Sequence, residues 1–89
     1  MKYLDCVEVI VEKEKYTNHG IHKGMQGIVW LEESINETWD VFFPQYGDKE
    51  EIAEIPIKEE DMKVIPKLDA LVNDKIKEQF GDLISFIIG

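Results

Sequence analysis

The chain contains no arginine, a single cysteine and no long apolar run, and each absence excludes a class of protein. Without arginine, it lacks the side chain that grips phosphate and guanine through two parallel hydrogen bonds. With Cys6 alone, neither an intramolecular disulfide nor a four-cysteine zinc site can form. No apolar stretch approaches the ~18 residues of a membrane helix, and the N-terminal residues do not resemble a signal peptide. We therefore expect a protein of the reducing cytoplasm.

The chain is strongly acidic, because it has nineteen carboxylate side chains and only ten lysines, which gives a formal net charge of −9. Such a charge opposes binding to a nucleic-acid backbone or an anionic membrane, since both attract basic side chains. It favours a basic protein as the partner, because complementary fields accelerate encounter and suppress wrong docking. The alternative interpretation is that the acidity only keeps the protein soluble.

The 89 residues fit one domain, and their apolar pattern is that of short strands. Val7, Val9 and Val11 alternate on one face of a half-buried strand that we expect over residues 4–12. Residues 13–23 indicate a polar loop, and Gly24 and Gly27 indicate positive φ in a tight turn after it. Four further strands are expected near residues 28–31, 38–43, 52–57 and 63–65, with a 3₁₀ turn at 58–62 before the last.

After Pro66 the apolar period becomes helical and predicts an amphipathic helix over residues 68–80. Asp69 suits the N-cap or the first turn, and Gly81 suits the position just after the helix. The apolar tail Leu83–Ile88 must then pack on the sheet, add a strand to it or meet another chain. The last alternative would give a homodimer through paired strand edges.

Five short strands with a long first loop and a late 3₁₀ turn are typical of a mainly β, five-stranded SH3-like barrel. The stretch 7–65 resembles the small bacterial barrel proteins of KOW and SH3-like type. Their pattern has a valine-rich first strand, a loop ending in Lys-Gly-x-x-Gly, here residues 23–27, and an aromatic third strand. The resemblance covers about two thirds of the chain. It implies a barrel over residues 1–66, with residues 67–89 as an extension packed on it in a single domain.

Motifs for catalysis or cofactor binding are weak in this sequence. His19 and His22 lie in the polar loop, where we expect two solvated histidines rather than metal ligands. The glycines match neither a Walker loop nor a dinucleotide fingerprint. The paired carboxylates, including those at 59–61, are expected on exposed loops and not in a cleft that could separate their pKa values. We expect no catalytic residue, no metal and no cofactor.

The acidity is concentrated in the middle of the chain, where residues 24–47 contain no lysine. Strand alternation places Trp39, Val41 and Phe43 on one face, so Phe42 is expected to face outward beside Tyr46. Apolar anchors with a charged surround are typical of a protein interface, although all the aromatic residues could instead be core. The predicted partner-binding residues are Glu32, Glu33, Glu37, Asp40, Phe42, Tyr46, Asp48, Glu50 and Glu51.

These features favour a small acidic protein-binding domain that masks a basic surface on a partner. In size and charge the chain resembles the immunity proteins that neutralise bacterial toxins, many of which are nucleases with basic active sites. That analogy implies a toxin or nuclease domain as the partner. The alternatives are an accessory RNA- or ribosome-associated barrel, which the charge opposes, and a non-catalytic subunit or regulator of an enzyme complex.

Overall fold

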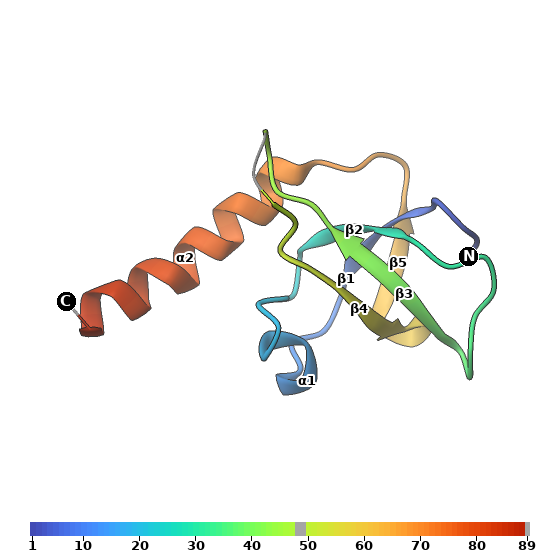
Figure 1. The fold of residues 1–89 in the computed structure, drawn as a ribbon, viewed down its shortest axis with the longest axis horizontal. Coiled ribbons are helices and arrows are strands. Elements are labelled where there is room, and N and C mark those ends of the chain that lie inside the picture. The colour runs from blue at the N-terminus through green and yellow to red at the C-terminus, as the bar shows by residue number, and fades with distance from the viewer. Residues whose placement is uncertain (48–49, 89) are drawn as a thin grey trace.

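The computed structural model describes the backbone of residues 1–47 and 50–88 and the side chains of residues 1–47 and 50–80. A single antiparallel sheet contains β1 (Cys6–Val9), β2 (Gln26–Val29), β3 (Thr38–Phe43), β4 (Ala53–Lys58) and β5 (Met62–Ile65). The other elements are α1 (Glu14–Thr17), the 3₁₀ turn η1 (Glu59–Asp61) and α2 (Ala70–Ile88) (Figure 1). The predicted mainly β architecture with a C-terminal helix is therefore confirmed.

The strand order in the sheet is β4-β3-β2-β1-β5, so β4 and β5 are its two edges. Among the described residues these edges do not pair with each other, so the five strands form a sheet that does not close into the predicted barrel. Pro56 lies on β4 and has no N–H to donate to a further strand. β5 has only four residues, all of them aligned with β1. The sheet therefore stays open, with η1 carrying the chain from one edge to the other.

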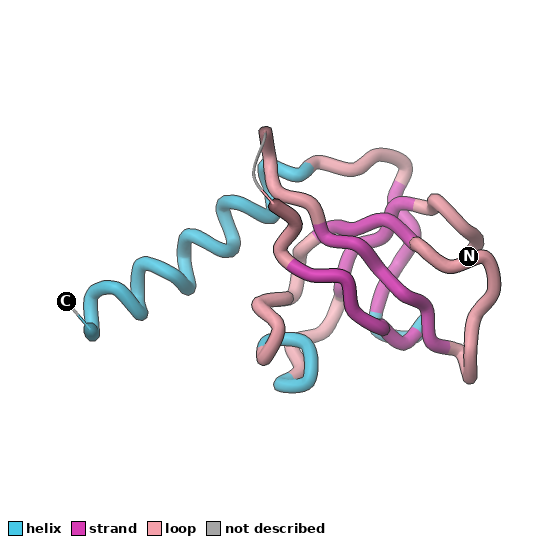
Figure 2. The backbone as a smooth tube through the Cα atoms, in the orientation of Figure 1, coloured by secondary structure: helices cyan, strands magenta, loops and turns pink. Residues whose placement is uncertain are grey.

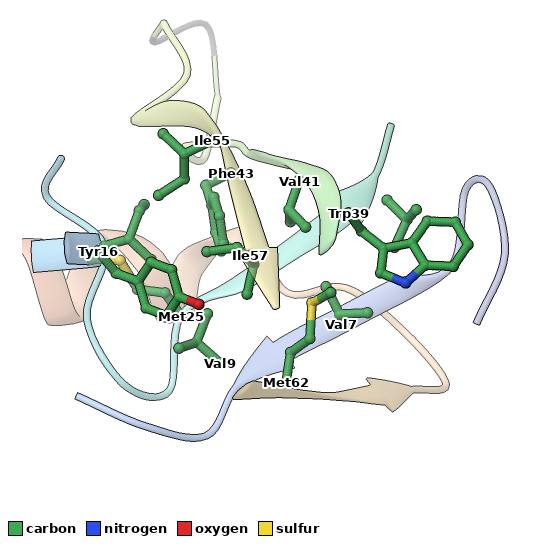
Figure 3. Packing of buried hydrophobic residues seen from close by; sticks show 12 residues of the cluster. Val7, Val9, Tyr16, Met25, Trp39, Val41, Phe43, Ile55, Ile57 and Met62 are labelled. Carbon is green, nitrogen blue, oxygen red and sulfur yellow. The ribbon is translucent and has the colours of Figure 1, made fainter. Parts of the chain in front are cut away.

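One face of the sheet carries the hydrophobic core, as the alternation of the sequence predicts. Val7 and Val9 of β1 are buried, as are Trp39, Val41 and Phe43 of β3. Figure 3 shows these side chains gathered in one cluster, with Tyr16 at one end and Trp39 at the other. The predicted strand at 38–43 has the observed bounds. The observed β1 is shorter than predicted, and β2 begins two residues earlier.

Gly27 lies inside β2 rather than in the turn before it, which corrects one expectation. A Cβ atom at this position would come within 2.6 Å of Val41 Cγ1 and 2.8 Å of the Phe42 carbonyl oxygen. The residue is therefore required because the neighbouring strand approaches closely. Gly24 does have the expected positive φ, at 93°.

The region 13–23, expected to be a loop, contains the short helix α1 and buries Tyr16 (2% exposed). Tyr16 Oη donates a hydrogen bond to Asp61 Oδ2 at 2.6 Å, and Lys13 Nζ lies 2.9 Å from both Asp61 oxygens. Asp61 is only 3% exposed, so the expectation that all the carboxylates at 59–61 lie on the surface was wrong for this residue. Its charge is tolerated because each carboxylate oxygen has a partner.

In this network of Lys13, Tyr16 and Asp61, the pKa values of the two acidic groups are shifted in opposite directions. Burial raises the pKa of Asp61, but the hydrogen bonds from Tyr16 and Lys13 outweigh it and hold the pKa below its usual value. Burial and the hydrogen bond to Asp61 raise the pKa of Tyr16 to about 12. The network thus joins α1 to η1 with an ionised carboxylate and a neutral phenol at neutral pH.

α2 begins after Asp69, whose Oδ1 accepts a hydrogen bond from the Leu71 N–H at 3.0 Å, as an N-cap does. The expected end at Gly81 was wrong, because the backbone stays helical to Ile88. A glycine inside a helix costs about 1 kcal/mol relative to alanine, which helix formers around it can offset. The alternative in which Leu83–Ile88 adds a strand is therefore excluded. The other two alternatives for Leu83–Ile88, packing on the sheet and contact with a second chain, depend on side chains outside the described residues.

Asn73 anchors α2 to the sheet and is fully buried. Its Oδ1 accepts a hydrogen bond from the Gln26 N–H at 2.6 Å, while Nδ2 donates to the carbonyls of Gln26 at 2.7 Å and Pro44 at 2.9 Å. The side-chain amide therefore bonds to both backbone groups of Gln26, as a neighbouring strand would. Ile76 of α2 also packs against the core, and the helix then runs away from the sheet (Figure 1). Over the part of the chain that is described, no helix has the length and apolar character needed to cross a membrane.

Candidate functional site

The face of the sheet opposite the core carries a row of half-buried side chains around three aromatic rings. In the strand register, Ile28 of β2 lies between Cys6 of β1 and Phe42 of β3. Trp30 follows β2 directly, and its ring centroid lies 6.1 Å from that of Phe42. The ring centroid of Tyr3 lies 5.7 Å from that of Trp30. We call the set Tyr3, Trp30 and Phe42 the outer aromatic face.

Two of these rings are far more exposed than a core would allow. Trp30 is 48% exposed and Tyr3 is 40% exposed, and Leu4, the residue after Tyr3, is 54% exposed. Contiguous exposed apolar groups of this kind are typical of interaction surfaces rather than of a solvated exterior. The interpretation that all the aromatic residues are core is therefore excluded for Tyr3 and Trp30.

A turn over residues 2–5 holds Tyr3 beside Trp30. The Asp5 N–H donates to the Lys2 carbonyl at 3.1 Å, and Asp5 Oδ2 accepts from the Lys2 N–H at 2.9 Å. Leu4 has a φ of 71°, a region that favours glycine, and its N–H donates to the Val29 carbonyl at 2.8 Å. In Figure 2 the N-terminus lies close to the loop between β2 and β3, as the Tyr3–Trp30 contact requires.

A tight hairpin turn bounds the same surface on its acidic side. Ile35 and Thr38 exchange two backbone hydrogen bonds, of 2.9 and 3.0 Å, around Asn36 and Glu37. Both central residues have positive φ, 52° and 60°, which identifies a type I′ turn. Asparagine is common in such turns, whereas glutamate there costs about 1 kcal/mol relative to glycine. The turn therefore displays a carboxylate at a position where glycine would be less strained.

Two hollows flank the segment 31–35. The larger, of about 550 Å³, is lined by the Tyr3 and Trp30 side chains and by Glu32 and Glu33. The smaller, of about 360 Å³, is lined by Asp40 and Pro56 among others. Leu31 and Ile35 line both hollows and so form the ridge between them.

Carboxylates crowd together next to the outer aromatic face. Glu54 of β4 lies opposite Phe42 in the register, and Asp40 lies opposite Pro56. Loss of solvation and the neighbouring Asp40 carboxylate raise the pKa of Glu54, with Glu51 adding to the effect. A raised carboxyl pKa means that the fold disfavours the ionised form of Glu54. A cation near Glu54 and Asp40 would reduce the repulsion between the two carboxylates.

The predicted site residues separate into two groups. Glu32, Glu33, Glu37, Asp40 and Phe42 lie around the outer aromatic face and its hollows.

The second group belongs to the loop between β3 and β4, at the far end of β3 from the Asn36–Glu37 turn (Figure 1). Tyr46 is 62% exposed there, and its N–H donates to Asp74 Oδ1 of α2 at 3.3 Å. Glu50 and Glu51 are exposed, and Asp48 lies outside the described residues. Phe42 packs near Trp30, and no described contact joins it to Tyr46.

Sequence reasoning left Tyr3 and Trp30 out of the site, and it included Ile35 and Glu54 only as members of the acidic segments 32–40 and 48–61. The available signal was alternation along β2, because Trp30 is two residues after Ile28 and one after the buried Val29, which puts it on the face opposite Val29. For Tyr3 no local signal existed, since its contact with Trp30 depends on the turn at Leu4.

His22 has a structural role. Its Nδ1 lies 2.9 Å from Glu12 Oε2, and its ring stacks on Phe80 of α2 with centroids 3.5 Å apart. Burial raises the pKa of Glu12, but the hydrogen bonds from His22 and from the Lys23 N–H lower it overall. Within residues 1–47 and 50–80, no three His, Cys, Asp or Glu side chains converge closely enough to hold a metal ion.

Comparison with known proteins adds no relative: no family model, curated protein or solved structure matches the chain.

Proposed function

We propose that this chain is a small acidic protein-binding domain, of the immunity or regulatory type, that masks a basic surface on a partner protein. The observation that carries the proposal is the outer aromatic face, where exposed Tyr3 and Trp30 adjoin the carboxylates of Glu32 and Glu33. Interfaces have aromatic residues at their centre and charged residues around them. Carboxylates arranged around aromatic anchors would attract a basic patch and orient it.

The fold proposed for this domain is an SH3-like one, in an open form. The strand order β4-β3-β2-β1-β5 and the 3₁₀ turn between β4 and β5 support it. In this arrangement the chain exposes the outer face of β2 and β3 while the opposite face is filled by the core. The partner would therefore dock on the sheet and on the hairpin turn, not on α2.

The test is a charge reversal with a matched control. The first variant carries Glu32→Lys, Glu33→Lys and Glu37→Lys. The control carries Glu14→Lys, Glu60→Lys and Glu78→Lys, which change the net charge equally at exposed positions elsewhere. The wild-type protein, immobilised, captures partners from a lysate of its native cells, and each captured protein is purified and its Kd measured against all three chains.

We expect a basic partner that keeps its affinity for the control and loses at least about tenfold, or 1.4 kcal/mol, toward the first variant. Equal losses with both variants would mean that only net charge matters. Micromolar RNA binding by the wild-type protein at low salt would overturn the proposal in favour of an accessory RNA-binding domain.

A further inference from the structure

The hollow of about 550 Å³ beside Trp30 has an aromatic wall that is not covered by the protein itself. The Tyr3 and Trp30 rings meet at 57° with centroids 5.7 Å apart, so they form an open corner rather than a stacked pair. Phe42 meets Trp30 at an interplanar angle of 39°. Nearly half of the Trp30 surface therefore stays accessible, at 48%.

The lining of this hollow also includes acidic residues. Glu32 and Glu33 line it, and both are exposed side chains. The residues that line the hollow include no lysine, and Lys2, which precedes Tyr3, is exposed to solvent. A cationic group entering the hollow would therefore meet two carboxylates and an indole face among the lining residues.

An arginine side chain has the chemistry that both the aromatic and the acidic lining residues need. Its planar guanidinium stacks on aromatic faces and sheds water more readily than an ammonium group does. Its fork of N–H donors can bond to a carboxylate at the same time as the plane lies on a ring. Because the chain has no arginine of its own, no side chain of this protein can occupy the hollow in this way.

We propose that the hollow between the Tyr3–Trp30 corner and the Glu32–Glu33 carboxylates binds one arginine side chain of the partner protein. The guanidinium stacks on Trp30 and donates hydrogen bonds to Glu32 or Glu33. The flanking residues of the partner cross the ridge of Leu31 and Ile35 toward the smaller hollow, where Asp40 adds a further negative charge. This assignment rests on the proposed function, because it names the group by which the basic partner is held.

The test uses small probes and the two tryptophans of the chain. N-acetyl-arginine methylamide is titrated into the ¹⁵N-labelled protein while the two indole N–H signals are followed by NMR. Trp39 serves as the internal reference, because it is 6% exposed and its Nε1 donates to Glu59 Oε1 at 2.9 Å. The matched probes are the citrulline analogue, which has the same shape without the charge, and the lysine analogue.

We expect the Trp30 indole signal to shift with saturation in the millimolar range while the Trp39 signal stays in place. The double variant Glu32→Gln, Glu33→Gln should bind the arginine probe at least about threefold more weakly. The double variant Glu60→Gln, Glu78→Gln should bind it with unchanged affinity. Equal shifts with the citrulline analogue, or equal affinity for the lysine analogue, would overturn the assignment to arginine. So would a Trp30 signal that does not move.

The two proposals can fail separately. If the charge-reversal variant loses a basic partner but the arginine probe does not bind, the proposed function stands and the arginine site is wrong. If the probe binds Trp30 but every partner tolerates the charge reversal, the arginine site stands and the proposed function is wrong.

Discussion

The two tryptophans differ in exposure because they lie on opposite faces of one sheet. Trp39 lies on the core face of β3, is 6% exposed and donates its indole N–H to Glu59. Trp30 follows β2 on the opposite face and is 48% exposed, with Glu32 and Glu33 next to it. The difference comes from strand parity, because alternate residues of a strand point to opposite faces. One tryptophan stabilises the fold, and the other is available for binding.

Two carboxylates show a similar contrast between a buried and a surface position. Asp61 is buried with Tyr16 and Lys13 as partners, and its pKa is held below the usual value. Glu54 lies at the outer surface near Asp40, and its pKa is raised. A lowered carboxyl pKa indicates a charge that the fold stabilises, and a raised one indicates a charge that the fold leaves in unfavourable company. The second kind is suited to an external cation.

The largest effect should come from truncating the buried tryptophan. Trp39→Ala removes a core ring and should lower the free energy of unfolding by about 3–5 kcal/mol. Trp30→Ala should lower it by less than about 1 kcal/mol, because that ring is half exposed. Urea unfolding measures both, and Trp39→Phe gives a milder variant if Trp39→Ala does not fold. Equal losses at the two positions would contradict the assignment of Trp30 to a binding surface.

The next effect concerns the buried carboxylate. Asp61→Asn weakens the hydrogen bonds of Tyr16 and Lys13 and should cost about 2–3 kcal/mol at pH 7. Because the folded pKa of Asp61 is lowered from 3.8, its contribution is present above that pH and is lost as the pH falls through the folded value. Urea unfolding between pH 2 and pH 7 should therefore show a smaller acid dependence in the variant. Asp40→Asn is the surface control, and a comparable loss there would break the contrast.

A smaller effect, of opposite sign, is expected at the hairpin turn. Glu37 has a φ of 60°, so Glu37→Gly should relieve strain and raise the stability by about 0.5–1 kcal/mol. The same variant should bind a basic partner more weakly, because it removes a carboxylate from the surface. Thermal unfolding and a binding titration measure the two effects. A variant that is less stable would show that the Glu37 side chain supports the turn.

The smallest effect is expected at Glu54. Its raised pKa means that the folded state is favoured while the carboxyl is protonated, and that this advantage disappears as the pH rises through the folded pKa. Glu54→Gln should therefore raise the stability at pH 7 slightly, by less than about 0.5 kcal/mol, since solvent and salt screen the repulsion. Unfolding at pH 7 in low and high salt tests this. A gain that persists in 1 M salt would not be electrostatic.

The sequence predicted the strands best where alternation was strong. Residues 39, 41 and 43 are apolar and alternate with Thr38, Asp40 and Phe42, and the structure gives that strand the same bounds. Closure of a barrel could not be read in this way, because it depends on whether β4 and β5 meet, which no local pattern reports. The predicted helix end at Gly81 was wrong because a glycine lowers helix stability but does not terminate a helix.

The candidate site was half predictable for a similar reason. The run of carboxylates at 32–40 and the outward side of β3 are visible in the sequence. Its other half is made by Tyr3, which reaches Trp30 through a turn in which a leucine has positive φ. Leucine is rare in that conformation, so a pattern of residue types predicts something else there. Long-range contacts made by unusual turns are where reasoning from sequence ends.

The anchoring of α2 by Asn73 has a consequence for how the chain folds during synthesis. Gln26 is made early, but the amide that pairs its N–H and carbonyl comes 47 residues later. β5, which pairs with β1, is also made late. The early strands β1 and β2 are therefore synthesised before β5 and Asn73, the groups that later bond to their backbone. A nascent chain paused before Asn73 should be an aggregation-prone intermediate, and a slow codon placed there should lower the yield of folded protein.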